Sequence, residues 1–257
     1  MKSFFTIPEY LNWANAYGST KGLKIKYYKG LGTSTAKEAK EYFSSLPDHK
    51  IEFEYVDRED EELIELAFAK KFADKRKEWL TTYSATDTYI DHSQALLRYK
   101  DFVNMELILF SVADCARSIP SGVDGFKPGQ RKIMFSCFKR KLRGEIKVAQ
   151  LAGYVSEHSA YHHGEQSLQQ TIGSLAQNFV GTNNINVLMP IGQFGTRNQG
   201  GSEAASARYI FTSLSPVTRH IYHEADDAVL EFLEEEGQSI EPIYYMPTIP
   251  MVLCNGA

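Results

Sequence analysis

The stretch from Arg117 to Lys132 carries residue types that could bind a phosphate group. It holds four cations among three glycines and two prolines. Pro128 suits the first position of a helix, and the free amides and the dipole of a helix start attract anions. Lys127 and Arg131 would add charge-assisted hydrogen bonds. A solvated helix start with scattered charges is the alternative, and in proteins generally it is the more frequent outcome.

The segment Tyr161-His162-His163-Gly164 is a second candidate. Its histidines could relay a proton, donate hydrogen bonds to a phosphate or bind a metal. Adjacent histidines rarely bind one metal well, and no cluster of acids accompanies them. A structural histidine with satisfied hydrogen bonds is the commoner outcome for any single one of them.

The segment from Gly192 to Gly201 has four glycines, but it is not a phosphate loop. It lacks the Gly-Lys-Ser/Thr ending that places a lysine on the β- and γ-phosphates of a nucleotide. We therefore expect no nucleotide-binding site in this chain.

Tyr209 is one of 15 tyrosines, and without context it would be assigned to packing. A phenol has a pKa of about 10, so about one part in a thousand is ionised at pH 7. A tyrosine that acts as a nucleophile therefore needs a neighbouring base or positive charge. Arg208 is adjacent in the sequence.

The composition is that of an ordinary globular protein of one large or two modest domains. The 257 residues are 43% hydrophobic and 23% charged. No apolar run approaches the roughly 20 residues that a membrane helix needs, and the first residues do not resemble a signal peptide. We expect an intracellular protein with no membrane partner. Its three cysteines are widely spaced, which predicts reduced thiols rather than a zinc site or disulfides.

The charge is unevenly distributed along the chain. The net charge is -4, yet residues 98–150 hold eleven Lys or Arg against five Asp or Glu. Residues 224–241 hold eight acids and no Lys or Arg. This separation predicts a basic surface and an acidic one. A nucleic-acid partner and two merely solvated faces are about equally supported by charge alone.

Residues 1–80 have an α/β pattern. Alternating apolar residues predict strands at 24–28 and 51–56, with a turn at 30–32. Thr35 and Glu38 have the spacing of a capping box, which predicts a helix to Leu46. A second helix is predicted from Glu61 to Leu80, and residues 81–104 are interpreted as a linker.

The second block is predicted to be helical with a short β segment. Helices are expected at 104–113 and from Pro128 to Lys141. A further helix is expected where a stripe of apolar residues at helical spacing ends at Gly181. Ile133, Cys137 and their apolar neighbours face one side of the middle helix, and its cations face the other: Arg131, Lys132, Lys139, Arg140 and Lys141. An irregular loop at 192–208 precedes a β-favouring segment at 208–214. This order favours an α+β fold with a winged-helix DNA-binding domain.

Seven motifs resemble signatures of the eukaryotic-type type IIA DNA topoisomerases, which are ATP-hydrolysing enzymes. They occur in the family's order across nearly the whole chain, and chance agreement of seven is negligible. They are Lys26-Tyr-Tyr-Lys-Gly-Leu-Gly-Thr-Ser34, Arg117 to Lys132, Lys147-Val-Ala-Gln-Leu-Ala-Gly153, Tyr161-His-His-Gly-Glu165, Leu175-Ala-Gln-Asn-Phe-Val-Gly181, Gly192-Gln-Phe-Gly-Thr-Arg197 and Ala204-Ala-Ser-Ala-Arg-Tyr-Ile-Phe-Thr212.

The resemblance implies domains and a function. Residues 1–80 resemble the C-terminal part of a Toprim domain, residues 105–246 a winged-helix domain, and residues 247–257 the start of a tower domain. The implied activity is transient cleavage and religation of double-stranded DNA through a 5′-phosphotyrosine link, which lets a second duplex pass. The implied parent protein is a nuclear homodimer that uses Mg²⁺ and ATP.

The resemblance also assigns roles to residues. Tyr209 would attack the DNA phosphodiester, and Arg208 would stabilise the transition state. His162 or His163 would take or relay the proton or hold the phosphate, and the sequence does not distinguish them. The other candidates are Arg117 and Arg131 beside the scissile phosphate, and the backbone contacts Arg76, Lys77, Lys127, Tyr161 and Lys132. For the surface cations, solvated charges without a partner remain an almost equal alternative.

The resemblance further implies that parts of the machinery lie outside this chain. The family's acidic metal ligands and its ATPase domain would precede Met1, so the chain alone is expected to be inactive. A non-enzymatic winged-helix module is the main rival hypothesis. It gives no reason for the Toprim-like block or for the Ala-Arg-Tyr context of Tyr209. A tyrosine recombinase would need catalytic arginines scattered through one helical domain, which this sequence does not show.

Overall fold

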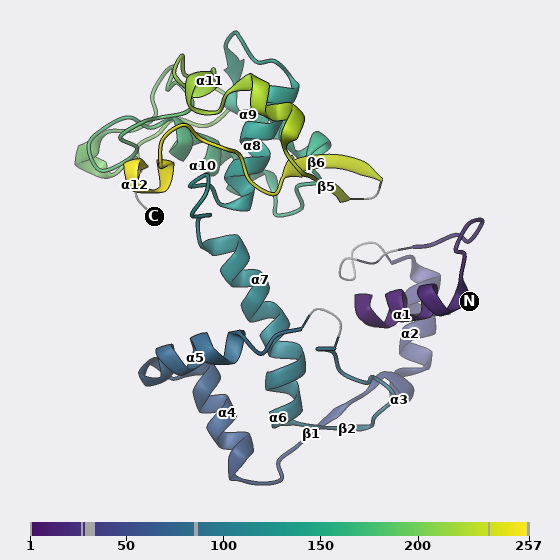
Figure 1. The fold of residues 1–257 in the computed structure, drawn as a ribbon. Helices are drawn as coiled ribbons and strands as arrows, with labels where there is room; N and C mark the ends of the chain where they lie inside the picture. The colour runs from purple at the N-terminus through teal and green to yellow at the C-terminus, as the bar shows by residue number, and fades with distance from the viewer. Residues whose placement is uncertain (1, 27, 29–33, 85–86, 236, 256–257) are drawn as a thin grey trace. The chain divides into compact units, whose positions relative to one another are not determined.

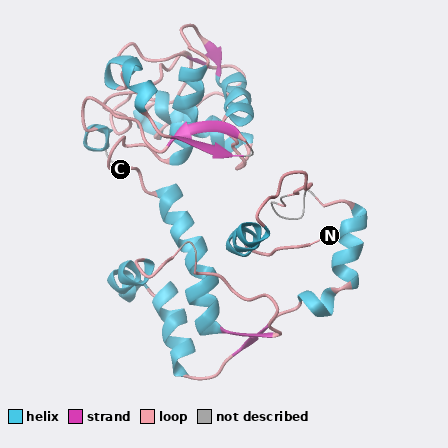
Figure 2. Cartoon of the chain, turned by 45° about the vertical axis from the view of Figure 1, so that its right-hand side comes forward, coloured by secondary structure: helices cyan, strands magenta, loops and turns pink. Residues whose placement is uncertain are grey.

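A computed structural model of the chain describes residues 2–26, 28, 34–84, 87–235 and 237–255. Its contacts divide the chain into two units, Met1–Asp114 and Cys115–Ala257. The division falls inside helix α7 (Ile108–Ser118). Figure 1 traces the elements of each unit, and Figure 2 shows that helices predominate over short strands in both. The chain therefore has a mixed α/β structure.

The described residues of the first unit form short helices and one pair of strands. The strands β1 (Glu52–Glu54) and β2 (Leu96–Arg98) are parallel. A 3-10 turn (Lys70–Phe72) separates α4 from α5, and a π-helical turn (Val103–Leu107) joins α6 to α7. The helices are α1 (Ile7–Tyr17), α2 (Ala36–Ser44), α3 (Leu46–His49), α4 (Arg58–Phe68), α5 (Ala73–Leu80), α6 (Tyr99–Phe102) and α7.

The predicted capping box is confirmed at the start of α2. The Thr35 side chain accepts a hydrogen bond from the Glu38 amide, and the Glu38 carboxylate accepts one from the Thr35 amide at 2.7 Å. The helix ends at Ser44, slightly before the predicted end at Leu46, where α3 begins. Residues 24–26 and 28 take no regular structure, and the rest of the strand and turn predicted at 24–32 lies outside the described residues.

The single helix predicted from Glu61 to Leu80 is two helices, α4 and α5. Ala69 adopts an extended conformation that ends α4. The Arg76 guanidinium then donates to the carbonyls of Leu66 at 2.9 Å and Ala69 at 2.7 Å. These carbonyls lie at a helix end, where intrahelical partners are missing. A tertiary contact of Arg76 thus satisfies the free carbonyl groups at the break between the helices. The hydrophobic periodicity of the sequence does not predict this contact.

Part of the predicted linker at 81–104 belongs to the first unit. Strand β2 pairs with β1, and the Lys100 amide donates to the buried Asp60 carboxylate at 2.8 Å. Trp79, Val103 and Ile108 form the small buried cluster of this unit, and Trp79 Nε1 donates to Asn104 Oδ1 at 2.9 Å. The boundary between the units therefore lies ten residues beyond the predicted end of the linker.

The second unit contains five helices and two antiparallel strand pairs among its described residues. β3 (Ile146–Lys147) pairs with β4 (Phe211–Thr212), and β5 (Phe232–Glu235) pairs with β6 (Gln238–Pro242). The chain also makes 3-10 turns at Arg197–Gln199 and Glu224–Val229. The helices are α8 (Pro128–Lys139), α9 (Val148–His158), α10 (Glu165–Ala176), α11 (Thr218–Ile221) and α12 (Met251–Asn255).

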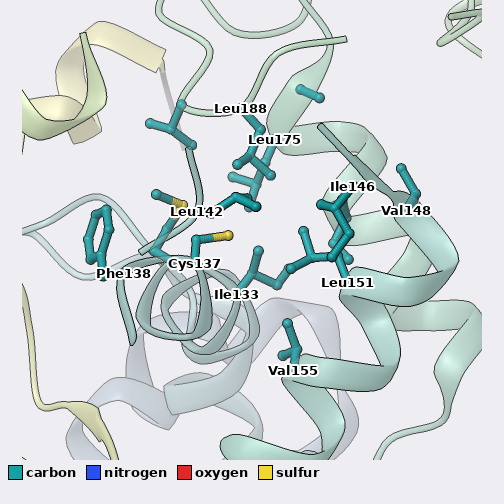
Figure 3. Packing of buried hydrophobic residues seen from close by; sticks show 14 of the residues in the cluster. Ile133, Cys137, Phe138, Leu142, Ile146, Val148, Leu151, Val155, Leu175 and Leu188 are labelled. Atoms are coloured by element: carbon teal, nitrogen blue, oxygen red, sulfur yellow. The ribbon is translucent and has the colours of Figure 1, made fainter. Parts of the chain in front are cut away.

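Three helices, α8, α9 and α10, enclose the core of the second unit. Ile133 and Cys137 of α8 lie against Leu151 and Val155 of α9, and Leu175 of α10 joins the same cluster (Figure 3). Burial of each aliphatic side chain stabilises the fold by about 1.5–3 kcal/mol. Burial also raises the pKa of the Cys137 thiol to about 12, so this thiol stays neutral and packs as an apolar group. None of the helices in the described part of the chain has the length and apolarity to cross a membrane.

Candidate functional site

Tyr209 is presented to solvent by a backbone that is held in place. Its side chain is 70% exposed. The carbonyls on either side of it, those of Ala207 and Ile210, accept hydrogen bonds of 3.1 Å from Ala149 and Val148. Both donors belong to the first turn of α9. The phenol thus projects from a turn that is bonded to the start of a core helix.

The residue after Tyr209 anchors this turn in the core. Ile210 is 5% exposed, and it packs against Gly192. Gly192 has a φ of +111°, and a Cβ at this position would lie 3.1 Å from Ile210 Cγ2. Glycine is the residue that fits both the conformation and the close approach. The glycine-rich segment therefore supports the tyrosine turn, and no nucleotide is needed to explain it.

The Arg208 guanidinium lies beside the phenol. Its central carbon is 5.5 Å from the Tyr209 ring centroid, and Nε donates to Ser206 Oγ at 3.4 Å. No carboxylate in the described part of the chain forms an ion pair with it. A guanidinium beside the phenol can attract the phosphate that the phenol would attack. The structure thus places side by side Arg208 and Tyr209, the two residues that the sequence predicts to act together.

The second candidate group gathers at the start of α8. The Tyr161 ring would lie 3.9 Å from a Cβ placed on Gly129, and its hydroxyl donates to Ser167 Oγ at 3.4 Å. The His163 ring meets the Tyr161 ring edge to face at 5.6 Å. Lys127, which precedes α8, is exposed. The half-buried Tyr161 and the exposed His163 thus lie at the start of α8, which the exposed Lys127 precedes.

His162 belongs to the same motif but already has a partner. Its Nε2 lies 3.1 Å from Oε1 of Glu235, at the end of β5. Two further acids of the acidic segment pair with cations: Asp227 with Arg219 at 2.6 Å and Glu241 with Lys132 at 2.8 Å. The expected separation into a basic and an acidic surface is therefore incomplete, because the segment 224–241 neutralises part of the basic charge.

One chain does not bring the two candidate groups together. The Tyr209 turn is bonded to the first residues of α9, whereas Tyr161 and His163 follow its last residue, His158. Eleven helical residues span about 16 Å. Helix α10 separates the same two groups. Gly164, which follows Tyr161 and His163, precedes the helix. Gln177 follows its end and donates to the carbonyl of Phe194, in the loop that leads to Tyr209. The predicted site is split between the two ends of a helix pair.

Arg131 lies inside the second unit. It is 6% exposed, and its guanidinium donates to both carboxylate oxygens of Asp124 at 2.7 and 3.0 Å and to the Phe126 carbonyl at 3.0 Å. Asp124 is fully buried and also accepts from the amides of Phe126 and Tyr245 at 3.0 Å. The assignment of Arg131 to a scissile phosphate stays a prediction. The structure gives the guanidinium an internal, bidentate partner.

Lys132, Arg76 and Lys77 also have partners within the chain. Besides Glu241, the Lys132 ammonium bonds the Ser159 carbonyl, and its side chain is 14% exposed. Arg76 satisfies the end of α4, and Lys77 forms an exposed ion pair with Asp74 at 2.8 Å. Arg117 lies in the last turn of α7 with an exposed side chain. Their proposed contacts with DNA stay predictions, and the Lys132 contact would require its buried ion pair to open.

The described side chains form no cluster of three or more metal-ligating groups. No group of three or more His, Cys, Asp or Glu that could hold a metal ion occurs among residues 2–26, 28, 34–84, 87–235 and 237–255. Mg²⁺ needs several oxygen ligands in near-octahedral geometry.

Comparison with known proteins identifies the family. Residues 1–115 match the C-terminal associated domain of TOPRIM, and residues 117–257, more than half of the chain, match the A subunit of DNA gyrase/topoisomerase IV. The chain belongs to the type II DNA topoisomerase family. The first match ends next to the boundary between the two units of the structure.

Individual relatives of this type II topoisomerase chain support the assignment. It is 59% identical over 256 residues to DNA topoisomerase 2 of Arabidopsis thaliana, which covers 99% of this chain and 17% of that protein. Identity with human DNA topoisomerase 2-beta is 56% over 270 residues, covering 99% and 16%. The chain thus spans about one sixth of the length of these relatives.

A solved structure shows the same fold. The DNA-binding, cleavage and re-ligation domain of Plasmodium falciparum topoisomerase II matches with a TM-score of 0.80 and 56% identity. The match covers 100% of this chain and 35% of that one. The resemblance inferred from the seven sequence motifs is confirmed.

Proposed function

We propose that this chain is the part of a type II topoisomerase that cuts and rejoins duplex DNA, with Tyr209 as the nucleophile. The observation that carries the proposal is an exposed phenol on a turn fixed to α9, with the Arg208 guanidinium beside its ring. A nucleophile needs access to its substrate and a fixed position, and Tyr209 has both.

The reaction is a transesterification. The Tyr209 oxygen attacks phosphorus and forms a new O–P bond, the bond from phosphorus to the 3′ oxygen breaks, and the phenol proton leaves while the 3′ oxygen gains one. One phosphodiester replaces another, so the reverse step reseals the strand. Arg208 neutralises the charge that grows on the phosphoryl oxygens, and one well-placed donor of this kind contributes about 3 kcal/mol. ATP would serve strand passage and not cutting.

The histidines of a second copy complete the site in this proposal. The separation of about 16 Å along α9 keeps Tyr161 and His163 from the Tyr209 of their own chain. In a symmetric homodimer the same contact between chains occurs twice, so each chain can contribute to the partner's site the groups that the partner's own chain holds too far away. Tyr209 of one chain would then meet Lys127, Tyr161 and His163 of the other, where an imidazole could take the phenol proton or hold the phosphate.

A mixing experiment tests the paired arrangement in the parent protein. One protomer carries Tyr209→Phe and the other His163→Ala. If the sites are shared, one site keeps both groups and the heterodimer nicks one strand. If each chain builds its own site, both sites lack a group and no nick forms.

The finer features of the parent protein also belong to the proposal. The arrangement of α8, α9 and α10 with the β3–β4 pair supports a winged-helix domain that binds double-stranded DNA. The use of Mg²⁺ and ATP, and a place in the nucleus, are proposed from the likeness to eukaryotic DNA topoisomerase 2 proteins. The metal would be held by residues other than those described here.

The decisive test traps cleavage in the parent protein with denaturant and identifies the peptide joined to DNA. Tyr209→Phe should abolish the adduct and leave DNA affinity unchanged, because only the hydroxyl is lost. Tyr244→Phe is the matched control, since Tyr244 is an exposed tyrosine of the same unit. An adduct on another tyrosine contradicts the assignment. A parent protein that binds DNA and never forms an adduct favours the non-enzymatic module.

A further inference from the structure

The loop at residues 159–164 carries Tyr161, His162 and His163 between α9 and α10. Ala160 in this loop has a φ of +49°, in the left-handed region, which costs a residue with a side chain about 1–2 kcal/mol. Such a conformation persists only where the surrounding structure holds it. The contacts that hold the loop in place therefore come from outside it.

Two contacts fix the chain just before the left-handed residue. Gln238 Nε2, in β6, donates to the His158 carbonyl at 3.4 Å. The Lys132 ammonium bonds the Ser159 carbonyl and pairs at 2.8 Å with the buried carboxylate of Glu241, also in β6. Strand β6 thus fixes the start of the loop, once directly and once through a lysine of α8.

A third contact fixes the loop after the left-handed residue. His162 Nε2 lies 3.1 Å from Oε1 of Glu235, and an ionised carboxylate only accepts hydrogen bonds, so Nε2 is the donor. Glu235 is directly opposite Gln238 in the β5–β6 register, which places both side chains on the same face of the hairpin. One face of the hairpin therefore bonds to the chain on both sides of Ala160.

The contact between His162 and Glu235 orders the loop more than it stabilises the unit. The two side chains are 48% and 31% exposed, and a pair with this exposure contributes at most about 1 kcal/mol. The residues on either side of His162 belong to the second candidate group, and their rings meet edge to face at 5.6 Å. A shift of His162 would therefore move both Tyr161 and His163 while the core stays folded.

We propose that Glu235 is a positioning residue for DNA cleavage. Through His162 it holds the loop in the conformation in which Tyr161 and His163 reach the tyrosine site of the other chain. This inference rests on the proposed function and deepens it. It gives the two histidines different tasks: His162 ties the loop to the hairpin, and His163 is the imidazole that meets the phenol or the phosphate.

The first measurement is single-turnover adduct formation by the parent protein at saturating DNA. Glu235→Ala should slow it about tenfold to a hundredfold, because a displacement of about 1 Å can cost a hundredfold in rate. DNA affinity and the unfolding midpoint should not change. Glu235→Gln should restore most of the rate, since the amide oxygen also accepts from Nε2. Glu234→Ala, at an exposed acid of the same strand, is the matched control. An unchanged rate in Glu235→Ala overturns the inference, and so does an equal loss in Glu235→Gln.

A double-mutant cycle tests whether Glu235 acts through His162. Glu235→Ala and His162→Ala remove the two ends of one contact, so the double variant should be no slower than the slower single variant. Effects that multiply would show two independent roles and would overturn the inference.

Hydrogen exchange of the parent protein, followed by mass spectrometry, observes the loop without any cleavage. The peptide that contains residues 159–164 should exchange faster in Glu235→Ala than in the parent protein or in Glu234→Ala. Unchanged exchange overturns the inference. Failure of the Tyr209 assignment is seen separately, because the parent protein then forms its adduct on another tyrosine or forms none.

Discussion

Arg131 and Arg208 lie in the same unit, and the family resemblance implies that both act at the scissile phosphate. Arg131 is 6% exposed and forms two hydrogen bonds with a fully buried carboxylate. Arg208 is exposed, pairs with no carboxylate in the described residues and lies beside the Tyr209 ring. Their surroundings, rather than their residue type or motif, separate a cation that holds the fold from one that can meet a substrate.

Replacement of each arginine in turn is the most direct test of whether Arg131 stabilises the fold and Arg208 does not. Arg131→Ala leaves the Asp124 carboxylate buried and unpaired, and loss of one partner of a buried pair costs about 3–5 kcal/mol. Arg208→Ala should change the free energy of unfolding by less than about 0.5 kcal/mol, because the side chain is exposed. Denaturant unfolding of the chain measures both. Asp124→Ala combined with Arg131→Ala is the control, and it should be less destabilised than Arg131→Ala. Similar unfolding of the two single variants would refute the distinction.

The converse prediction concerns cleavage. In the parent protein at saturating DNA, Arg208→Ala should slow adduct formation about a hundredfold, because it removes one transition-state donor. Arg208→Lys should be intermediate, since lysine keeps the charge but loses the planar fork that grips two oxygens. The measurement is single-turnover adduct formation. An unchanged rate in Arg208→Ala would show that the guanidinium beside the phenol takes no part in the reaction.

The support beneath Tyr209 can be tested without touching either arginine. Gly192→Ala places a Cβ 3.1 Å from Ile210 Cγ2 at a φ of +111° and should cost about 1–2 kcal/mol. Adduct formation should also slow, because Ile210 fixes the Tyr209 turn. Gly153→Ala is the matched control: this helical glycine has open space, so alanine should stabilise the chain by up to about 1 kcal/mol. Equal behaviour of the two variants would show that the turn does not depend on Gly192.

The smallest predicted effects compare the neighbours Arg76 and Lys77 in the first unit. Arg76→Ala removes two hydrogen bonds to the end of α4 and should destabilise by about 1 kcal/mol. Lys77→Ala breaks only an exposed ion pair and should not change the unfolding midpoint measurably. Thermal unfolding followed by circular dichroism distinguishes them. If DNA affinity falls for Lys77→Ala alone, the DNA role belongs to Lys77 and the structural role to Arg76.

Local signals in the sequence predict elements whose causes are local. Thr35 and Glu38 correctly predict the start of α2, and Pro128 correctly predicts the start of α8. Helix α9 was not predicted, although Val148, Leu151 and Val155 have helical spacing and are buried. The break after Phe68, where α4 ends, is satisfied by a hydrogen bond from the distant Arg76, and the hydrophobic periodicity of the segment does not predict that bond.

The candidate site shows the same limit. The motifs name Arg208 and Tyr209 together, and the structure places the guanidinium beside the ring because the two residues are adjacent. They do not reveal that Arg131 faces Asp124 or that Lys132 faces Glu241, since these partners are set by tertiary packing. The distance between Tyr209 and His163 becomes predictable only once α9 is recognised as the helix that separates them.

The attachment of the Tyr209 turn to α9 also has a mechanical meaning. A DNA strand joined to Tyr209 would pull on a turn that is tied to the first residues of the helix by the hydrogen bonds from Val148 and Ala149. The load would pass into a helix whose Val148, Leu151 and Val155 are buried in the core. Tension on a cut strand would then be carried by the packed interior of the unit and not by a flexible loop.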